Sequence, residues 1–279
     1  HFLSRRFCAL FAQLRSRYFY PYKSNRPLLS RWQLKAYRQF FYYLSFYELK
    51  AFRKLFGQHG SVLEIIIMIK LDIMSDPICP WCYIGKTQLD RALKENKNHP
   101  FKIEWHPFQL NPDMPSVGMD RRDYLERKFG GKKQAVQFYS NIEQKAQELD
   151  LPINFSGMKR TPNTVNAHRL IHWAGLKDKQ QKIIDELFDA YFCKAIDIGD
   201  HDVLCDIAKK AGLDQEIVGR LLVSDSDIKL ISERDSHSRK MGVTAVPTFI
   251  IANQHVVPGS QTPEVWNTII IELLAQLEN

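Results

Sequence analysis

Cys79 and Cys82 carry the clearest chemistry in this sequence of 279 residues. Residues 69–73, before them, alternate between apolar and polar side chains, which is typical of a strand. Residues 83–93, after them, have a helical pattern, so Cys79 is expected where the helix begins and the two sulfurs face each other across one turn. Free N–H groups and the positive end of the helix dipole favour a thiolate at that place. The pattern predicts thiol–disulfide exchange, with Cys79 as the attacking thiolate and Cys82 as the resolving thiol.

A C-x-x-C pair also occurs in zinc sites and in structural disulfides. A zinc site with four sulfur ligands needs a second pair, and the remaining cysteines offer no such spacing; they are Cys8, Cys193 and Cys205. A structural disulfide in so short a loop would constrain the unfolded chain little. We therefore expect no metal site, and no cofactor beyond the redox-active disulfide itself. We interpret Cys193 and Cys205, which fall in successive predicted helices, as buried free cysteines rather than as a second disulfide.

Four stretches of the sequence together resemble one known family. Cys79-Pro80-Trp81-Cys82-Tyr83-Ile84-Gly85 is similar to the C-P-W-C-Y-x-G motif of the DsbA family of thioredoxin-like oxidoreductases, and within it to the FrnE-like branch. Three further stretches resemble that branch: Trp105–Pro112, Asn163-Thr164 with Ala167–Leu170, and Gly242–Phe249. The resemblance extends from about Met68 to the C-terminus.

The resemblance implies an α/β protein with a thioredoxin fold that is interrupted by a large inserted all-helical domain. The first part of the thioredoxin fold is expected at 68–115, the helical insert at 116–242 and the second part at 243–279. Periodicity agrees with this order, because strand patterns occur at 101–106 and 246–252, and no convincing strand lies between them.

The resemblance also implies where a substrate binds. In thioredoxin-like proteins the proline that corresponds to Pro247 is cis and faces the C-x-x-C pair. Val246 and Pro247 are then expected to present backbone to an extended substrate, a form of strand addition. Pro80 and Trp81, between the two cysteines, complete the expected substrate-binding residues.

The first 67 residues differ in composition from the rest. They contain twelve Lys or Arg and two acids, a balance of +10, whereas residues 68–279 contain 27 Lys or Arg and 29 acids, a balance of −2. The basic charge therefore gives the remainder of the chain no nucleic-acid-binding signature. We expect residues 1–67 to be a non-native or disordered extension, with Met68 as the true start. The segment has no signal-peptide pattern and its apolar run is too short to cross a bilayer, so we expect a cytoplasmic protein without membrane association.

The favoured function is a thiol–disulfide oxidoreductase or isomerase that acts on protein or small-molecule thiols and disulfides, with glutathione as a candidate co-substrate, in a monomer or a homodimer. Pro80-Trp81 replaces the Pro-His dipeptide of strongly oxidising DsbA proteins, which argues for a less oxidising pair. The alternative is a glutathione-dependent transferase or isomerase similar to kappa-class glutathione transferases and 2-hydroxychromene-2-carboxylate isomerases. Those enzymes typically have serine where this chain has Cys79 and lack the second cysteine, so Cys82 favours the oxidoreductase.

Four further residues have chemistry that the cysteine pair leaves unused. Asp72 and Asp76 flank the predicted strand, and a carboxylate near the resolving cysteine can accept its proton, although turn or surface positions explain both residues. His168 and His172 are spaced to share a metal on one helix face, but we interpret them as core or surface histidines.

Overall fold

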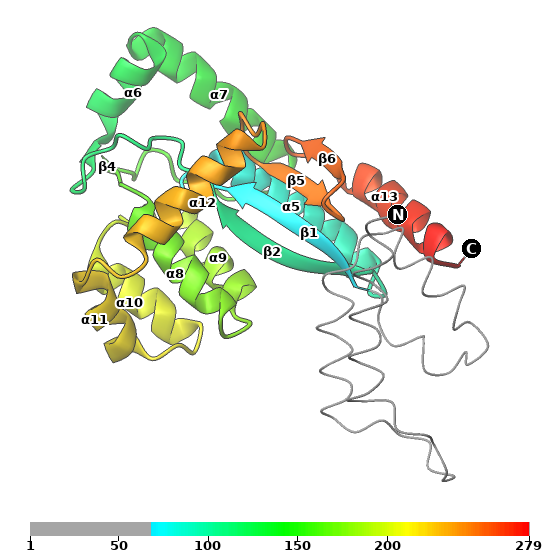
Figure 1. The fold of residues 1–279 in the computed structure, drawn as a ribbon. Coiled ribbons are helices and arrows are strands. Elements are labelled where there is room, and N and C mark those ends of the chain that lie inside the picture. The colour runs from blue at the N-terminus through cyan, green and yellow to red at the C-terminus, as the bar shows by residue number, and fades with distance from the viewer. Residues whose placement is uncertain (1–67, 279) are drawn as a thin grey trace, which may run out of the picture. The chain divides into compact units, whose positions relative to one another are not determined.

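The computed structural model describes residues 68–278 (Figure 1). The expectation that residues 1–67 are a non-native or disordered extension lies outside the described residues. A four-stranded sheet, in the order β2-β1-β5-β6, forms the centre of the described part. β1 (Ile69–Ser75) pairs in parallel with β2 (Phe101–Pro107), as expected for two strands joined by a helix. On its other side β1 pairs antiparallel with β5 (Thr248–Ile251), which forms a hairpin with β6 (His255–Pro258).

One face of the sheet is apolar and packs against two helices. α5 (Pro80–Glu95) connects β1 to β2, and α13 (Pro263–Glu278) packs beside it. Trp266 of α13 is fully buried and contacts Phe249 of β5 edge-on, with ring centroids 4.8 Å apart. Phe249 is the register partner of Ile73, so these residues share the face that forms the hydrophobic core.

The opposite face of the sheet is polar and meets α12 (Ile228–Lys240). Because side chains alternate along a strand, Asp72 of β1 and its register partner Glu104 of β2 both point away from Ile73. Arg234 of α12 lies 3.3 Å from the carboxylate of Glu104 and joins the helix to the sheet. Both faces of β1 are thus covered, which explains why nearly the whole strand is buried.

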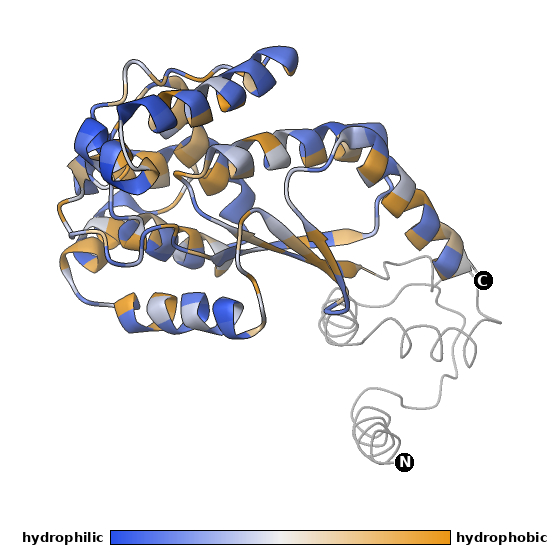
Figure 2. Ribbon diagram, turned by 90° about the horizontal axis from the view of Figure 1, so that it is seen from above, coloured by the Kyte–Doolittle hydropathy of each residue, from blue (hydrophilic) through white to orange (hydrophobic). Residues whose placement is uncertain are grey.

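The segment between the two halves of the sheet is mainly helical. Its helices are α6 (Arg121–Phe129), α7 (Lys132–Glu148), α8 (Val165–Gly175), α9 (Gln180–Phe188), a π-helical turn (Asp189–Cys193), α10 (His201–Lys210), α11 (Gln215–Val223) and α12. Aspartate side chains cap α6, α10 and α11 by accepting hydrogen bonds from backbone N–H groups of the first turn. The strands are mostly apolar, whereas the outer helices mix polar and apolar faces (Figure 2).

The thioredoxin fold with inserted helices is confirmed, with one correction. The insert is not entirely helical, because β3 (Met119–Asp120) and β4 (Arg160–Thr161) form a small antiparallel sheet. Strands of two residues are too short to show the alternation by which a strand is recognised in a sequence. Within residues 68–278, every helix is too short or too polar to cross a bilayer.

Candidate active site

The two cysteines lie at the junction of β1 and α5. Cys79 is the N-cap of α5 in an extended conformation, and Pro80 occupies the first helical turn, where its fixed φ suits the helix and its missing N–H is not needed. The helix therefore begins at the C-x-x-C pair, as expected from the helical pattern that follows it. The N–H groups of Cys82 and Tyr83 donate to the carbonyl of Cys79, at 3.0 and 3.2 Å. This turn places the Cys79 side chain at the positive end of the helix dipole.

Both cysteines are buried free thiols, with 3% of Cys79 and 1% of Cys82 exposed. Burial raises the pKa of the Cys82 thiol well above its ordinary value, and the neighbouring sulfur of Cys79 raises it further. Cys82 is thus a protonated thiol as long as Cys79 is not part of a disulfide. Of the two residues between them, Pro80 is buried and Trp81 is half-buried.

The structure brings Val246 and Pro247 to Cys79. The Val246–Pro247 peptide bond is cis. The Sγ of Cys79 lies 3.6 Å from the carbonyl oxygen of Val246, although the two residues are 167 positions apart in the chain. The carbonyl of Pro247 accepts a hydrogen bond from Gly259 N–H at 2.8 Å, which ties the segment to the end of the β5–β6 hairpin.

Gly85 explains how closely α5 and the proline segment approach each other. A Cβ atom at Gly85 would lie 3.0 Å from Cγ of Pro247 and 3.4 Å from Ser260. Any larger residue would push the proline ring away from the helix that carries the cysteines. Gly85 was part of the sequence motif, but its physical role becomes visible only in the structure.

Asp76 lies beneath Cys79 as a fully buried carboxyl group. Its backbone carbonyl accepts the N–H of Cys79 at 2.9 Å, and its side chain accepts from Ile78 N–H at 3.3 Å and from Leu110 N–H at 2.7 Å. Burial raises the pKa of this carboxyl from 3.8 to about 7, against the opposing effect of these hydrogen bonds. The turn position expected for Asp76 is therefore correct. A turn position alone does not require the raised pKa of its carboxyl.

The helical insert supplies polar groups close to the cysteines. In α6, Tyr124 and Lys128 both donate to the side-chain oxygen of Asn111, at 2.9 and 2.7 Å. Burial lowers the pKa of Lys128, and the nearby Asp76 and Cys79 counteract that effect. Lys128 is thus a cation whose field reaches the reactive thiol, and no pattern in the sequence identified it.

His168 and His172 point to different partners and do not form a shared site. His168 lies in α8 with its Nε2 4.0 Å from the carboxyl of Asp76. His172, one turn later, accepts a hydrogen bond at Nδ1 from Arg234 of α12 at 3.1 Å. Their interpretation as core or surface histidines holds for burial, since His168 is buried and His172 half-buried.

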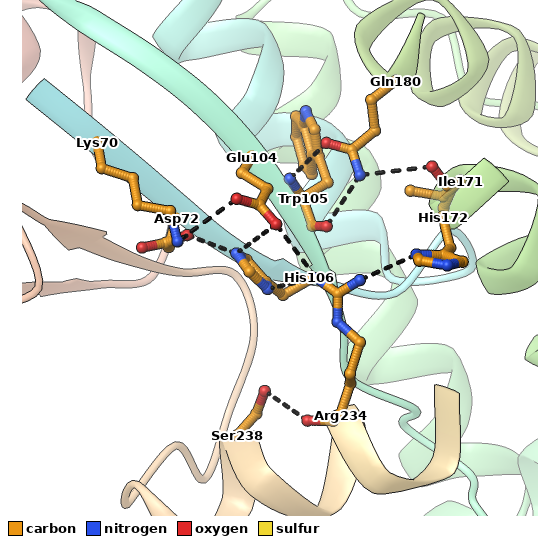
Figure 3. Close-up of polar contacts among 10 residues, drawn as sticks. All are labelled: Lys70, Asp72, Glu104, Trp105, His106, Ile171, His172, Gln180, Arg234 and Ser238. Atoms are coloured by element: carbon orange, nitrogen blue, oxygen red, sulfur yellow. Dashed lines mark hydrogen bonds and ion pairs between the residues drawn. The ribbon is translucent and has the colours of Figure 1, made fainter. Parts of the chain in front are cut away.

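A second polar cluster lies on the α12 face of the sheet (Figure 3). Asp72, Glu104 and His106 are the group in the described part of the chain with the spacing of metal ligands, their donor atoms lying within 4.8 Å of one another. However, the ammonium of Lys70 lies between the carboxylates, 2.7 Å from Asp72 and 3.4 Å from Glu104. Arg234 donates to Glu104 and to Nδ1 of His106. Two cations match the two carboxylates, so we interpret the cluster as an ion-pair network that fixes α12 to β1 and β2.

Cys193 and Cys205 are free thiols, as expected, but only Cys205 is buried, because Cys193 is half-buried at the end of the π-helical turn. The Sγ of Cys193 lies 3.3 Å from the hydroxyl of Tyr83 and donates to the carbonyl of Pro152 at 3.4 Å. Cys205 lies in α10, buried against α11, where a Cβ at Gly219 would come within 3.5 Å of its sulfur.

Comparison with known proteins finds a sequence relative and solved structures with a similar fold. The chain is 28% identical to the uncharacterized protein YwbO of Bacillus subtilis over 203 residues, which is 72% of this chain and 96% of that protein. The structure of a probable DsbA oxidoreductase from Streptomyces coelicolor is similar with a TM-score of 0.66 and 24% identity, over 74% of this chain and 90% of that one.

Two further structures share the fold at lower identity. A 2-hydroxychromene-2-carboxylate isomerase matches with a TM-score of 0.58 and 14% identity, over 74% of this chain and 97% of that one. The cytosolic disulfide reductase DsbM from Pseudomonas aeruginosa, in complex with GSH, matches with a TM-score of 0.54 and 16% identity, over 74% and 99%. A family model described as DSBA-like thioredoxin domain matches residues 70–270, which is most of the chain. The chain therefore belongs to the family of DSBA-like thioredoxin domains.

Proposed function

We propose that this protein is a thiol–disulfide oxidoreductase of the FrnE-like branch, in which Cys79 and Cys82 alternate between a dithiol and a disulfide. One observation carries the proposal. Cys79 stands at the N-terminus of α5 with its sulfur 3.6 Å from the Val246 carbonyl, next to the cis peptide bond and one helical turn from a second thiol. An attacking sulfur, a resolving sulfur and a backbone segment for substrate thus meet at one place.

The reaction begins when the thiolate of Cys79 attacks one sulfur of a substrate disulfide. A bond forms between Cys79 and that sulfur, the substrate S–S bond breaks, and the other substrate sulfur leaves as a thiolate that takes a proton from solvent. Cys82 then loses its proton and attacks the sulfur of Cys79, which releases the second substrate thiolate. Two electrons have passed from the cysteine pair to the substrate, and the Cys79–Cys82 disulfide remains. The reverse sequence donates a disulfide.

Each flanking residue has a role in this cycle. Val246 and Pro247 present backbone to an extended substrate segment beside Cys79, and Trp81 contributes its half-buried ring to the same region. Pro80 acts from a buried position, by starting the helix rather than by touching substrate. The high pKa of Cys82 keeps the resolving thiol protonated until the mixed disulfide has formed.

We infer that the working direction is reduction or isomerisation in the cytoplasm, with glutathione as a co-substrate. The dipeptide between the cysteines has no histidine to stabilise the thiolate, which favours a less oxidising pair than Pro-His. The similar fold of DsbM, a cytosolic disulfide reductase solved with GSH, is compatible with this direction.

The test uses the full chain in glutathione buffers of graded redox ratio, followed by alkylation and peptide mass analysis. We expect Cys79 and Cys82 to lose two protons together and reversibly as the buffer becomes more oxidising, and the midpoint defines the direction. Cys82→Ser should accumulate a mixed disulfide with glutathione at Cys79. Cys205→Ser is the matched control and should cycle normally, since that thiol lies in α10 of the insert and not in the thioredoxin fold that carries the pair.

Two outcomes would overturn the proposal. If the wild-type pair never closes, there is no dithiol–disulfide cycle. If Cys79 instead carries only a stable glutathione adduct although Cys82 is present, the glutathione-dependent transferase or isomerase becomes the better function.

A further inference from the structure

The carboxyl of Asp76 is buried without a cation bonded to it. Among the described residues, its side chain accepts from two backbone N–H groups and from the hydroxyl of Thr164, and Lys128 reaches it only through its field. A buried carboxylate is costly unless it is paired or takes up a proton. The group therefore needs a partner with which it can share a proton, and the structure places one at the required position.

That partner is His168 of α8. Its imidazole is buried, and in the described part of the chain its Nε2 has no hydrogen-bond partner. The nearest acid is Asp76, whose Oδ1 lies 4.0 Å away. An imidazole nitrogen accepts a hydrogen bond from a protonated carboxyl and, as the other tautomer, donates one to a carboxylate. A shift of about 1 Å would therefore give the nitrogen a partner in either state.

We propose that Asp76 and His168 hold a single exchangeable proton between them, and that this pair sets the charge beneath Cys79 and so controls how readily Cys79 attacks a disulfide. The inference rests on the proposed function, because it concerns the reactivity of the same thiol. Asp76 and His168 act here as positioning residues, since neither touches the reacting sulfur atoms of the substrate.

The proton of this pair exchanges near neutral pH. Burial raises the pKa of Asp76 to about 7 and lowers that of His168 to about 4, so His168 is neutral throughout and Asp76 changes charge. Lys128 and Tyr124 of α6 and Tyr191 of the π-helical turn also lie in the field of Asp76. Asp235 and Arg234 of α12 act on His168 with opposite signs.

Loss of the proton has a defined effect on Cys79. The backbone carbonyl of Asp76 accepts a hydrogen bond from the N–H of Cys79, so the carboxyl and the thiol belong to the same turn. Below about pH 6 the carboxyl is neutral and leaves the thiolate of Cys79 undisturbed. Above about pH 8 it carries a negative charge, which disfavours a second negative charge on the sulfur. The protein should therefore be less reactive at alkaline pH than its cysteine alone would be.

The experiment compares full-length wild type with Asp76→Asn from pH 5 to pH 9. The rate of alkylation of Cys79 and the equilibrium constant with glutathione are measured, and each is expressed as the ratio of variant to wild type, which cancels the titration of the reagent. We expect a ratio near one below pH 6 and a ratio of at least about three above pH 8, with a midpoint near the titration of Asp76. Asp72→Asn removes a buried carboxyl from β1, which belongs to the ion-pair network and not to the turn of Cys79, and should give a ratio that does not vary with pH.

His168 is tested by two variants. His168→Gln can still donate and accept, so the midpoint should stay in place, whereas His168→Leu removes the partner of the carboxylate and should move the midpoint to higher pH. Thermal unfolding shows whether each variant is folded. A ratio for Asp76→Asn that is constant across the pH range would overturn the inference, because a purely structural role changes reactivity by the same factor at every pH. If wild type does not cycle at all, the proposed function fails first, and the two failures are thereby distinguished.

Discussion

Replacing Arg169 should destabilise the protein more than replacing any exposed arginine. Arg169 lies in α8 and is fully buried. Its guanidinium donates to four backbone carbonyls in and after the last turn of α11; they belong to Leu221, Leu222, Ser224 and Ser226. It also donates to Asn166 and lies 5.0 Å from the ring centroid of Trp173. One cation thus satisfies the end of a helix and the turn that leads into α12.

The size of the effect follows from what happens to these carbonyls. In Arg169→Met the carbonyl of Leu222 remains in a buried residue, whereas that of Ser224 lies in an exposed one and can bond to water. Breaking a buried charged network in this way costs about 3–5 kcal/mol, so we expect a loss of about 4 kcal/mol. Arg169→Lys keeps the charge but loses the planar set of donors, and it should cost roughly half as much.

Urea unfolding followed by tryptophan fluorescence measures both values. Arg127→Met, at an exposed site on α6, is the matched control and should change stability by less than about 0.5 kcal/mol. The reasoning is refuted if Arg169→Met costs less than about 1 kcal/mol, since water would then have replaced every bond. It is also refuted if the lysine variant is no more stable than the methionine variant, because the charge would then contribute nothing.

Three other predictions concern separate features. Gly85→Ala gains up to about 1 kcal/mol in helix propensity but presses a Cβ onto the ring of Pro247, so we expect little net change in stability. Exchange at Cys79 should slow several-fold in the glutathione assay, and equal rates in the variant and wild type would refute the contact. In urea unfolding, Trp266→Phe should lower the stability by about 1–2 kcal/mol less than Trp173→Phe does. Among the described residues, the indole N–H of Trp266 has no hydrogen-bond partner, whereas that of Trp173 donates to Asp227 at 2.8 Å. The reverse order of the two losses would count against this reasoning. The carboxyl of Asp76 has a pKa of about 7 in the native state against 3.8 in the unfolded state, so between these pH values the native state holds the extra proton. The stability of wild type relative to Asp76→Asn should therefore fall by on the order of 4 kcal/mol as the pH rises from 4 to 8. Urea titrations at each pH measure this difference, and a constant difference would contradict the prediction.

Local patterns in the sequence were sufficient for the elements that carry the cysteines. Alternation predicted β1, and the C-x-x-C pair at the start of a helical run placed Cys79 at the N-cap of α5. The position of Pro247 opposite Cys79 followed from resemblance and not from periodicity, because no local pattern reports a contact across 168 positions of chain. Thr164 is the N-cap of α8, and Asn163, one position earlier, accepts the Val165 N–H.

The polar interior could not be predicted in the same way. Asp76 and His168 are 92 positions apart, and their meeting depends on how α8 packs against the end of β1. The same is true of the ion pair between Lys70 and Glu104. Two adjacent strands must pair in the correct register, and α12 must pack against them, before Lys70 and Arg234 can both pair with the carboxylate of Glu104. Such contacts are set by tertiary packing, which leaves no periodic trace in the residues that make them.

The insert therefore does more than cover the sheet, because it also fixes the surroundings of Cys79. Asp235 and Arg239 of α12 bond to the N–H and the carbonyl of Gln109, and Arg239 lies 4.1 Å from the ring centroid of Phe108. These contacts fix the segment after β2 whose next residue, Leu110, donates its N–H to the carboxyl of Asp76. A displacement of α12 would thus be transmitted to Cys79 through the backbone of Gln109 and Leu110 and the buried carboxyl of Asp76. Because buried polar contacts depend strongly on geometry, substitutions at this helix should alter the reactivity of the cysteine pair without touching it.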